Sequence, residues 1–138
     1  MNPALLLDTC AAIWIIENAA LSEAAVAAID QAYDSGHAVY VSPITAWEIG
    51  MLAARGRFKT TLPPHRWFRR LLEVRGVRLA EMSHETLISS SFLPGNLHRD
   101  PADRILAATA RENDYALVTR DRALLGYAEQ GHIRAIAC

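Results

Sequence analysis

Acidic side chains in four separate stretches of the sequence are of the type that holds a divalent cation. They are Asp8, Glu48, Asp103 and Asp121. Carboxylate oxygens without histidine or cysteine partners favour Mg²⁺ or Mn²⁺ over zinc. One or two such ions can bind a phosphodiester, lower the pKa of a water and steady the leaving oxygen of an in-line displacement. The chemistry that these residues predict is therefore phosphodiester hydrolysis.

A group of carboxylates at one place needs a positive charge beside it. Two carboxylates about 4 Å apart repel by roughly 4 kcal/mol at an effective dielectric near 20, and a bound cation offsets this repulsion. The five histidines are scattered along the chain, and no Ser–His–Asp or Cys–His order is present. The sequence thus gives little support to zinc or to nucleophilic catalysis.

The stretch HRDPADRILAATA, residues 98–110, places two acids at one helix start. Asp100 precedes Pro101, which favours extended backbone before it and the first helical position for itself. Asp103 is then the third helical residue, where unpaired N–H groups and the helix dipole favour a carboxylate. Small apolar residues follow and let the helix lie close to a sheet, with Arg104 and Arg111 expected to face water.

Two more acids follow short apolar runs. Residues 4–7 predict a strand buried on both faces that ends at Asp8, and a buried helix is expected directly afterwards over residues 9–17. Residues 116–118 predict a second such strand, closed by Thr119-Arg120-Asp121. Ligands of open α/β sheets bind beyond the carboxyl ends of the strands, so both acids are expected in such a place.

Glu48 belongs to a helix expected over residues 44–55. The predicted apolar stripe of this helix is formed by Ile44, Trp47, Met51 and Leu52. Glu48 is four positions after Ile44, so it borders the face that packs inward. An ionised acid is seldom buried without a partner, and that partner is either Arg55, a helix N-terminus or a metal shared with the other acids.

Each acid also has a purely structural interpretation. Aspartate is a common N-cap, and Asp8 (or Thr9), Asp100 and Asp121 all stand where a helix is expected to begin. Asp100 with an acid three positions later is a variant of the capping box. If the acids are only caps, they need not lie near one another.

The remaining pattern alternates strands with helices. Further strands are expected over residues 38–41, 77–80 and 133–136, and further helices over 22–35, 65–75, 83–92 and from Asp121 to about 130. This alternation predicts an α/β fold with three layers, α/β/α, around a mainly parallel sheet of about four or five strands with right-handed crossovers. A length of 138 residues predicts a single domain spanning 1–138.

Composition restricts the class of protein. Hydrophobic residues make up 51% and the net charge is −1, so the chain is not disordered and has no overall attraction to nucleic acid. The cations are thirteen Arg and Lys59, and residues 55–75 are the most basic stretch. An RNA backbone or an acidic partner fits this stretch, although a solvated helix face is the commoner outcome.

The cysteines and the first residues bear on cellular location. Cys10 and Cys138 form neither a disulfide framework nor a CxxC metal site, and Cys10 lies in an apolar stretch that predicts a buried thiol. A reducing cytosol fits this usage. The start MNPALLLDT lacks the charged segment of an export signal, and Asp8 interrupts its apolar run well short of a membrane span.

Four motifs in order resemble one known family. LLLDT, SPITAWEIG around Glu48, HRDPADRILAATA and LVTRD are similar to those of PIN-domain ribonucleases, specifically the VapC-like toxins of type II toxin–antitoxin systems, over nearly the whole chain. The resemblance implies a PIN fold and a cytoplasmic Mg²⁺- or Mn²⁺-dependent endoribonuclease that is toxic because it cleaves RNA. It also implies homodimers and a cognate antitoxin whose C-terminal segment covers the acidic groove, often with a basic side chain.

The same resemblance assigns roles to residues. The family's catalytic and metal-binding acids correspond to Asp8, Glu48, Asp103 and Asp121, and none of the four is missing. The accessory positions are Asp100, Thr119 and Thr9.

Three alternatives compete with this assignment. A signalling receiver domain has adjacent acids after its first strand and a late Lys, whereas Thr9 follows Asp8 and the only Lys is Lys59. A haloacid-dehalogenase-like phosphatase needs a second Asp two residues after the first, where Cys10 stands. A PIN fold that has lost catalysis and only binds a partner is disfavoured by the intact acids.

Overall fold

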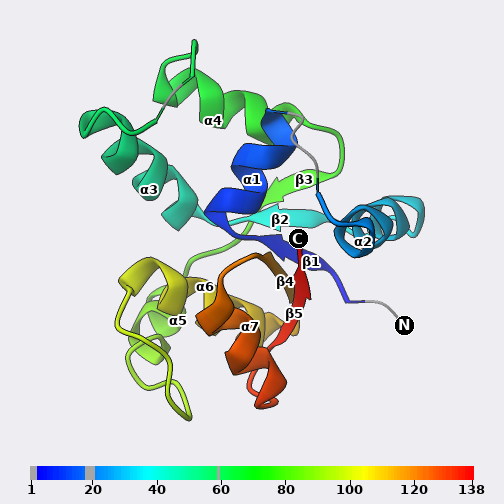
Figure 1. Cartoon of the computed structure of the whole chain (residues 1–138), viewed down its shortest axis with the longest axis vertical. Helices are drawn as coiled ribbons and strands as arrows, with labels where there is room; N and C mark the ends of the chain where they lie inside the picture. The colour runs from blue at the N-terminus through cyan, green and yellow to red at the C-terminus, as the bar shows by residue number, and fades with distance from the viewer. Residues whose placement is uncertain (1–2, 18–20, 59) are drawn as a thin grey trace.

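The computed structural model describes residues 3–17, 21–58 and 60–138, and a parallel sheet of five strands lies at its centre (Figure 1). The strand order is β3-β2-β1-β4-β5, and every pair of neighbours is parallel. The strands are β1 (Leu5–Leu7), β2 (Val39–Val41), β3 (Val77–Leu79), β4 (Ala116–Thr119) and β5 (Arg134–Ala137).

Helices cover both faces of this sheet (Figure 1). Those on one face are α1 (Thr9–Ile16), α2 (Glu23–Asp34), α3 (Pro43–Ala54) and α4 (Pro64–Glu73). On the other face lie α6 (Pro101–Asn113) and α7 (Arg122–Glu129), with α5 (His84–Ser89) packed against α6. The predicted three-layer α/β/α fold is therefore confirmed.

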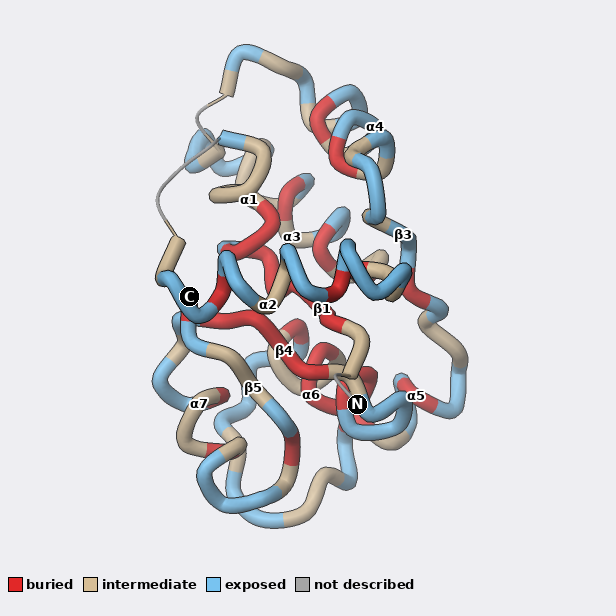
Figure 2. The backbone as a smooth tube through the Cα atoms, turned by 90° about the vertical axis from the view of Figure 1, so that its right-hand side faces the viewer, coloured by how far each residue is buried: buried red, intermediate tan, exposed pale blue. Residues whose placement is uncertain are grey.

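The side chains of β1 show how the two core layers are built. Leu5 and Leu7 contact the core under α1 to α4, whereas Leu6 points into the core under α6 and α7, and none of the three is more than 2% exposed. A strand buried on both faces explains the uninterrupted apolar run in the sequence. In Figure 2, β1 and β4 are the buried centre of the molecule.

The strand order places a topological switch point at the carboxyl ends of β1 and β4. These two strands are neighbours, but α1 leaves β1 on one face of the sheet and α7 follows β4 on the other. Two connections that diverge to opposite faces leave a crevice between them, and ligands of open α/β sheets bind in such crevices. Asp8 directly follows β1, and Asp121 lies just after the end of β4, so both acids stand at this crevice.

Most predicted element boundaries agree with the structure to within one or two residues, with one clear error. The helix predicted over residues 83–92 ends at Ser89. Among the described residues, no helix is both long enough and apolar enough to cross a membrane.

The predicted apolar stripe of α3 is correct for Ile44, which packs against the core, but wrong for Trp47. Trp47 is 54% exposed, and the residues of this helix that are fully buried are Thr45 and Ile49. The helix is apolar almost all round, so the periodicity of its sequence does not say which side faces the core.

Candidate functional site

A chain of hydrogen bonds joins the ends of β1 and β4. Asp8 is 6% exposed; its Oδ1 accepts from the backbone N–H of Ala11 at 2.7 Å, and its Oδ2 accepts from Thr119 Oγ1 at 2.6 Å. Thr119 is fully buried, and its hydroxyl oxygen accepts the N–H of Asp121 at 3.0 Å. Asp8 thus caps α1 as the structural interpretation predicts, and also belongs to the network between the strands.

The start of α6 brings a second pair of acids to the crevice. Asp100 Oδ1 caps the helix by accepting from the N–H groups of Ala102 at 3.0 Å and Asp103 at 3.2 Å. This cap fixes the first turn, which carries the Asp103 side chain. Asp121 caps α7 in the same manner through Leu124 at 2.9 Å. The caps predicted from the sequence are therefore present.

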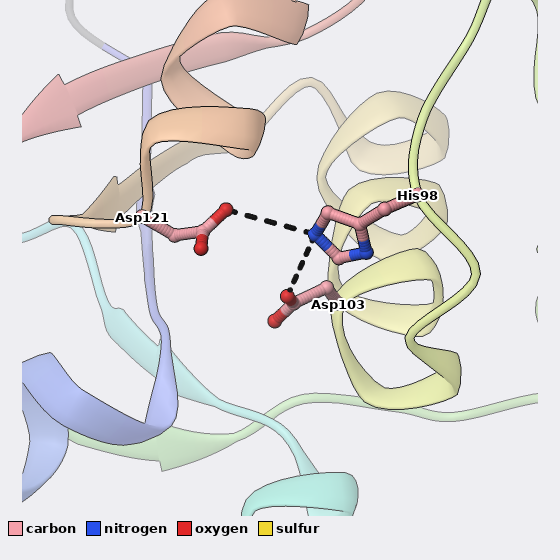
Figure 3. Close-up of side chains that lie close together, drawn as sticks. All are labelled: His98, Asp103 and Asp121. Carbon is pink, nitrogen blue, oxygen red and sulfur yellow. Dashed lines mark ion pairs between the residues drawn. The ribbon is translucent and has the colours of Figure 1, made fainter.

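A histidine lies between two of these acids. His98 Nε2 is 3.1 Å from Asp103 Oδ2 and 3.7 Å from Asp121 Oδ2, and one ligand atom from each of the three residues falls within 4.8 Å of the others (Figure 3). The sequence interpretation took the five histidines as scattered along the chain and gave His98 no role, so this contact was not predicted. The available signal was its place two residues before Asp100, in a loop that must pass the start of α6.

Glu48 reaches the crevice from α3. Its Oε1 accepts a 2.5 Å hydrogen bond from Thr9 Oγ1, and that hydroxyl lies 3.2 Å from Thr45 Oγ1. No ion pair joins Glu48 to Arg55 within the residues that the structure describes. Of the two structural partners expected for Glu48, Arg55 is therefore wrong, whereas a helix N-terminus is correct, since the side chain contacts Thr9, the first residue of α1.

Burial raises the pKa of three of the acids. Desolvation is the largest cause for Asp8, Glu48 and Asp103, and it raises the pKa of Asp103 to about 7. Hydrogen bonds from Thr119 to Asp8 and from Thr9 to Glu48 act in the opposite direction, because they stabilise the ionised carboxylates.

Mutual repulsion is the second sign that the acids converge. After burial, the charge of Asp100 and then that of Asp121 raise the pKa of Asp103, whereas His98 lowers it. Asp121 also raises the pKa of Asp8, and Asp8 raises that of Glu48. Side chains distant in the sequence therefore act on one another, and the crevice accumulates negative charge.

Cys10 contradicts its prediction. The thiol was expected to be buried, but the residue is exposed in the first turn of α1. Partial desolvation, followed by the charges of Asp8 and Glu48, raises its pKa to about 11. This thiol therefore stands beside the acidic crevice rather than in the core.

Arg104 is a further correction, because it does not face water as predicted. Its Nε donates to the carbonyl of Ser90 at 2.8 Å, and its Nη1 donates to the carbonyls of Leu97 at 2.9 Å and His98 at 3.3 Å. The arginine after Asp103 thus holds the loop that precedes α6. Arg111 is exposed as expected, with Nη1 donating to the carbonyl of His132 at 2.7 Å.

The basic stretch forms a surface separate from the acids. Arg66, Arg69 and Arg70 are exposed on α4 and, with Leu62 and Glu73, line an open hollow of about 380 Å³. Arg75 lies over the ring of Tyr33 at 4.8 Å. Lys59 lies outside the described residues. None of the residues that line this hollow belongs to the acidic crevice.

Comparison with known proteins connects this geometry with a family. Residues 5–130 match the PIN domain family. Ribonuclease VapC22 of Mycobacterium tuberculosis is 35% identical over 121 residues, which cover 87% of this chain and 88% of that protein.

Two solved structures share the fold. One is the structure of VapBC2 from Rickettsia felis bound to a DNA fragment from its promoter. Its TM-score is 0.69 at 12% identity, and the match covers 97% of this chain and 98% of that one. A toxin-antitoxin complex from Klebsiella pneumoniae has a TM-score of 0.57 at 22% identity and covers 89% of this chain and 92% of that one. With a family match over most of its length and a relative at 35% identity, the chain belongs to the PIN domain family.

Proposed function

We propose that this protein is a metal-dependent endoribonuclease and the toxin of a type II toxin–antitoxin pair. The observation that carries the proposal is the convergence of Asp8, Glu48, Asp103 and Asp121 on the crevice at the ends of β1 and β4. Its similarity to Ribonuclease VapC22 and to a toxin-antitoxin complex supports this assignment.

The donor set fits a hard divalent cation. Within the described residues, no Arg or Lys side chain forms an ion pair with any of the four acids. His98 and Arg120 offset part of the repulsion at Asp103 and Asp8, and a bound cation would offset the rest. Carboxylate oxygens are the donors that Mg²⁺ and Mn²⁺ prefer. The four acids would hold such an ion, which when bound polarises a phosphodiester and acidifies a water.

The accessory residues keep the acids in place. Thr119 orients the carboxylate of Asp8 through Oδ2, and Thr9 does the same for Glu48. Asp100 accepts hydrogen bonds from two backbone N–H groups through one carboxylate oxygen and so fixes the turn that carries Asp103. We assign these three residues to positioning, since each acts on a neighbouring acid or on its helix.

The proposed partners follow from membership of the PIN domain family and from the similarity to Ribonuclease VapC22. The substrate is RNA, met in the cytoplasm, and a cognate antitoxin would cover the acidic groove with a C-terminal segment that carries a basic side chain. The protein is proposed to act as a homodimer. A member of the family that binds a partner without cleaving RNA would keep the fold and the antitoxin but show no metal-dependent activity.

The deciding experiment is cleavage of total RNA by the purified protein with Mg²⁺ or Mn²⁺, and with EDTA as the control. Asp8→Asn keeps a side-chain oxygen to cap α1 and should remove cleavage without loss of folding. Wild-type protein that is folded and binds the ion but leaves RNA intact would favour the non-catalytic alternative. Growth arrest on expression without antitoxin, absent with Asp8→Asn, would test the toxin role.

A further inference from the structure

The imidazole of His98 lies between carboxylates of two different elements. Asp103 belongs to α6 and Asp121 stands before α7, and Nε2 of His98 faces both (Figure 3). A histidine among acids has two possible roles at a metal site. It either gives a nitrogen lone pair to the ion, or donates an N–H to a carboxylate that binds the ion.

The second ring nitrogen decides between these roles. Nδ1 accepts a 3.2 Å hydrogen bond from the backbone N–H of Asp100, so it carries a lone pair and no proton. In a neutral imidazole the proton is then on Nε2, the nitrogen that faces the acids. A protonated Nε2 donates to Asp103 Oδ2 at 3.1 Å and has no lone pair to offer a metal.

The position of this ring is fixed by the loop and by α6. Arg104 holds the carbonyls of Ser90, Leu97 and His98 itself, and the hydroxyl of Tyr127 donates to the carbonyl of Pro94. Asp103 and the arginine that anchors the His98 loop are consecutive residues of one helix. The imidazole and its acceptor are therefore placed by the same turn of backbone.

We propose that His98 is a positioning residue of the metal centre and not a metal ligand. Its Nε2–H engages Asp103 Oδ2, which sets the orientation of that carboxylate and leaves Oδ1 free of the imidazole. This inference rests on the proposed function, because it presupposes that Asp103 binds a divalent ion. In this role His98 affects how tightly the ion binds but not the preference for Mg²⁺ or Mn²⁺.

The test measures Mg²⁺ and Mn²⁺ affinity of the full chain by calorimetry for wild type, His98→Ala and His98→Gln. Loss of the N–H donor should weaken both affinities by a similar factor, roughly tenfold. This is the lower end of the effect seen when a group that hydrogen-bonds to a metal ligand is removed. The glutamine amide can donate to Asp103 and should recover most of the affinity. A nitrogen ligand would instead favour Mn²⁺ over Mg²⁺, so its removal would lower the Mn²⁺ affinity selectively.

The chain offers a matched control. His84 Nε2 lies 3.1 Å from Glu85 Oε1, the same separation as in the His98–Asp103 pair, but both side chains are at least 73% exposed. His84→Ala should leave both affinities unchanged. Thermal unfolding of each variant without metal reports whether the fold is retained.

The outcomes separate this inference from the proposed function. A selective loss of Mn²⁺ affinity in His98→Ala would make His98 a ligand and overturn the inference. Affinities of His98→Ala equal to those of His84→Ala would also overturn it, while leaving the proposed function intact. Wild-type protein that binds neither ion would overturn both.

Discussion

Thr119 Oγ1 donates a 2.6 Å hydrogen bond to Asp8 Oδ2 and so links the ends of two neighbouring parallel strands. This bond favours the ionised carboxylate, whereas burial raises the pKa of Asp8. The same hydroxyl accepts the N–H of Asp121. One buried side chain therefore links the first of the four candidate site acids, Asp8, to the last, Asp121.

Replacement of this hydroxyl should cost stability. Thr119→Val preserves shape but leaves the Asp8 carboxylate and the Asp121 N–H without this partner, and we expect the free energy of unfolding to fall by about 2 kcal/mol. Urea denaturation at pH 8 measures this change. Thr119→Ser keeps the hydroxyl and should lose clearly less; a Thr119→Val protein as stable as wild type would contradict the role of these hydrogen bonds.

Glu48 should matter for cleavage more than for folding. In Glu48→Gln the amide oxygen can still accept from Thr9, so the thermal midpoint should change little, while the rate of RNA cleavage should fall at least about tenfold. A matched control exists on α6, where Glu112 accepts from Thr86 Oγ1 at 2.6 Å. Glu112→Gln changes a similar pair away from the crevice, and an equal loss of activity there would contradict the role of Glu48.

Asp103 should make stability depend on pH. Its pKa is raised from 3.8 to about 7 in the folded protein, so between these values the native state holds a proton that the unfolded state releases. The free energy of unfolding attributable to Asp103 therefore falls as the pH rises from about 4 to about 7. Partial exposure screens the charge, and we expect Asp103→Asn to be about 1 kcal/mol more stable than wild type above pH 7.

The measurement is chemical denaturation in EDTA across this pH range, for wild type and Asp103→Asn. Because Asp8 and Glu48 also have raised pKa values, the difference between the two proteins isolates Asp103. A difference that stays constant from pH 4 to pH 8 would contradict the assignment.

The arginines of α4 give a prediction about salt. If the RNA backbone contacts the surface of Arg66, Arg69 and Arg70, their joint replacement by Gln should flatten the dependence of RNA affinity on salt. Three lost phosphate contacts correspond to a slope smaller by about 2 in a plot of log affinity against log salt concentration. Binding is measured with Asp8→Asn as the background to prevent cleavage. An unchanged slope would mean that this surface is only solvated.

The sequence predicted the fold well because its strands are unusually clear. The apolar runs before Asp8 and before Thr119-Arg120-Asp121 identify the two central strands, and Asp100-Pro101 marks the start of α6. From these signals the order of elements and the helix caps follow. The side of α3 that packs inward did not follow, since that helix is apolar almost all round and tertiary contacts alone select Thr45 and Ile49.

The site was predictable in its acids but not in what surrounds them. Strand ends and caps place Asp8, Asp121 and the turn that carries Asp103, so these positions are visible in the sequence, whereas Glu48 lies in the middle of α3. His98 and Arg104 were missed because the path of the loop before α6 decides where they point, and no periodicity governs a loop. Cys10 was misjudged because the start of α1 borders the crevice instead of the core.

The exposed thiol of Cys10 carries a consequence for chemical reagents. With its pKa raised to about 11, little of this thiol is in the reactive thiolate form at pH 7. Accessibility alone would mark this residue as a target for alkylating reagents or peroxide, yet partial desolvation, and after it the charges of Asp8 and Glu48, disfavour the thiolate. The surroundings of the crevice thus favour the protonated, less nucleophilic form of the cysteine at its rim.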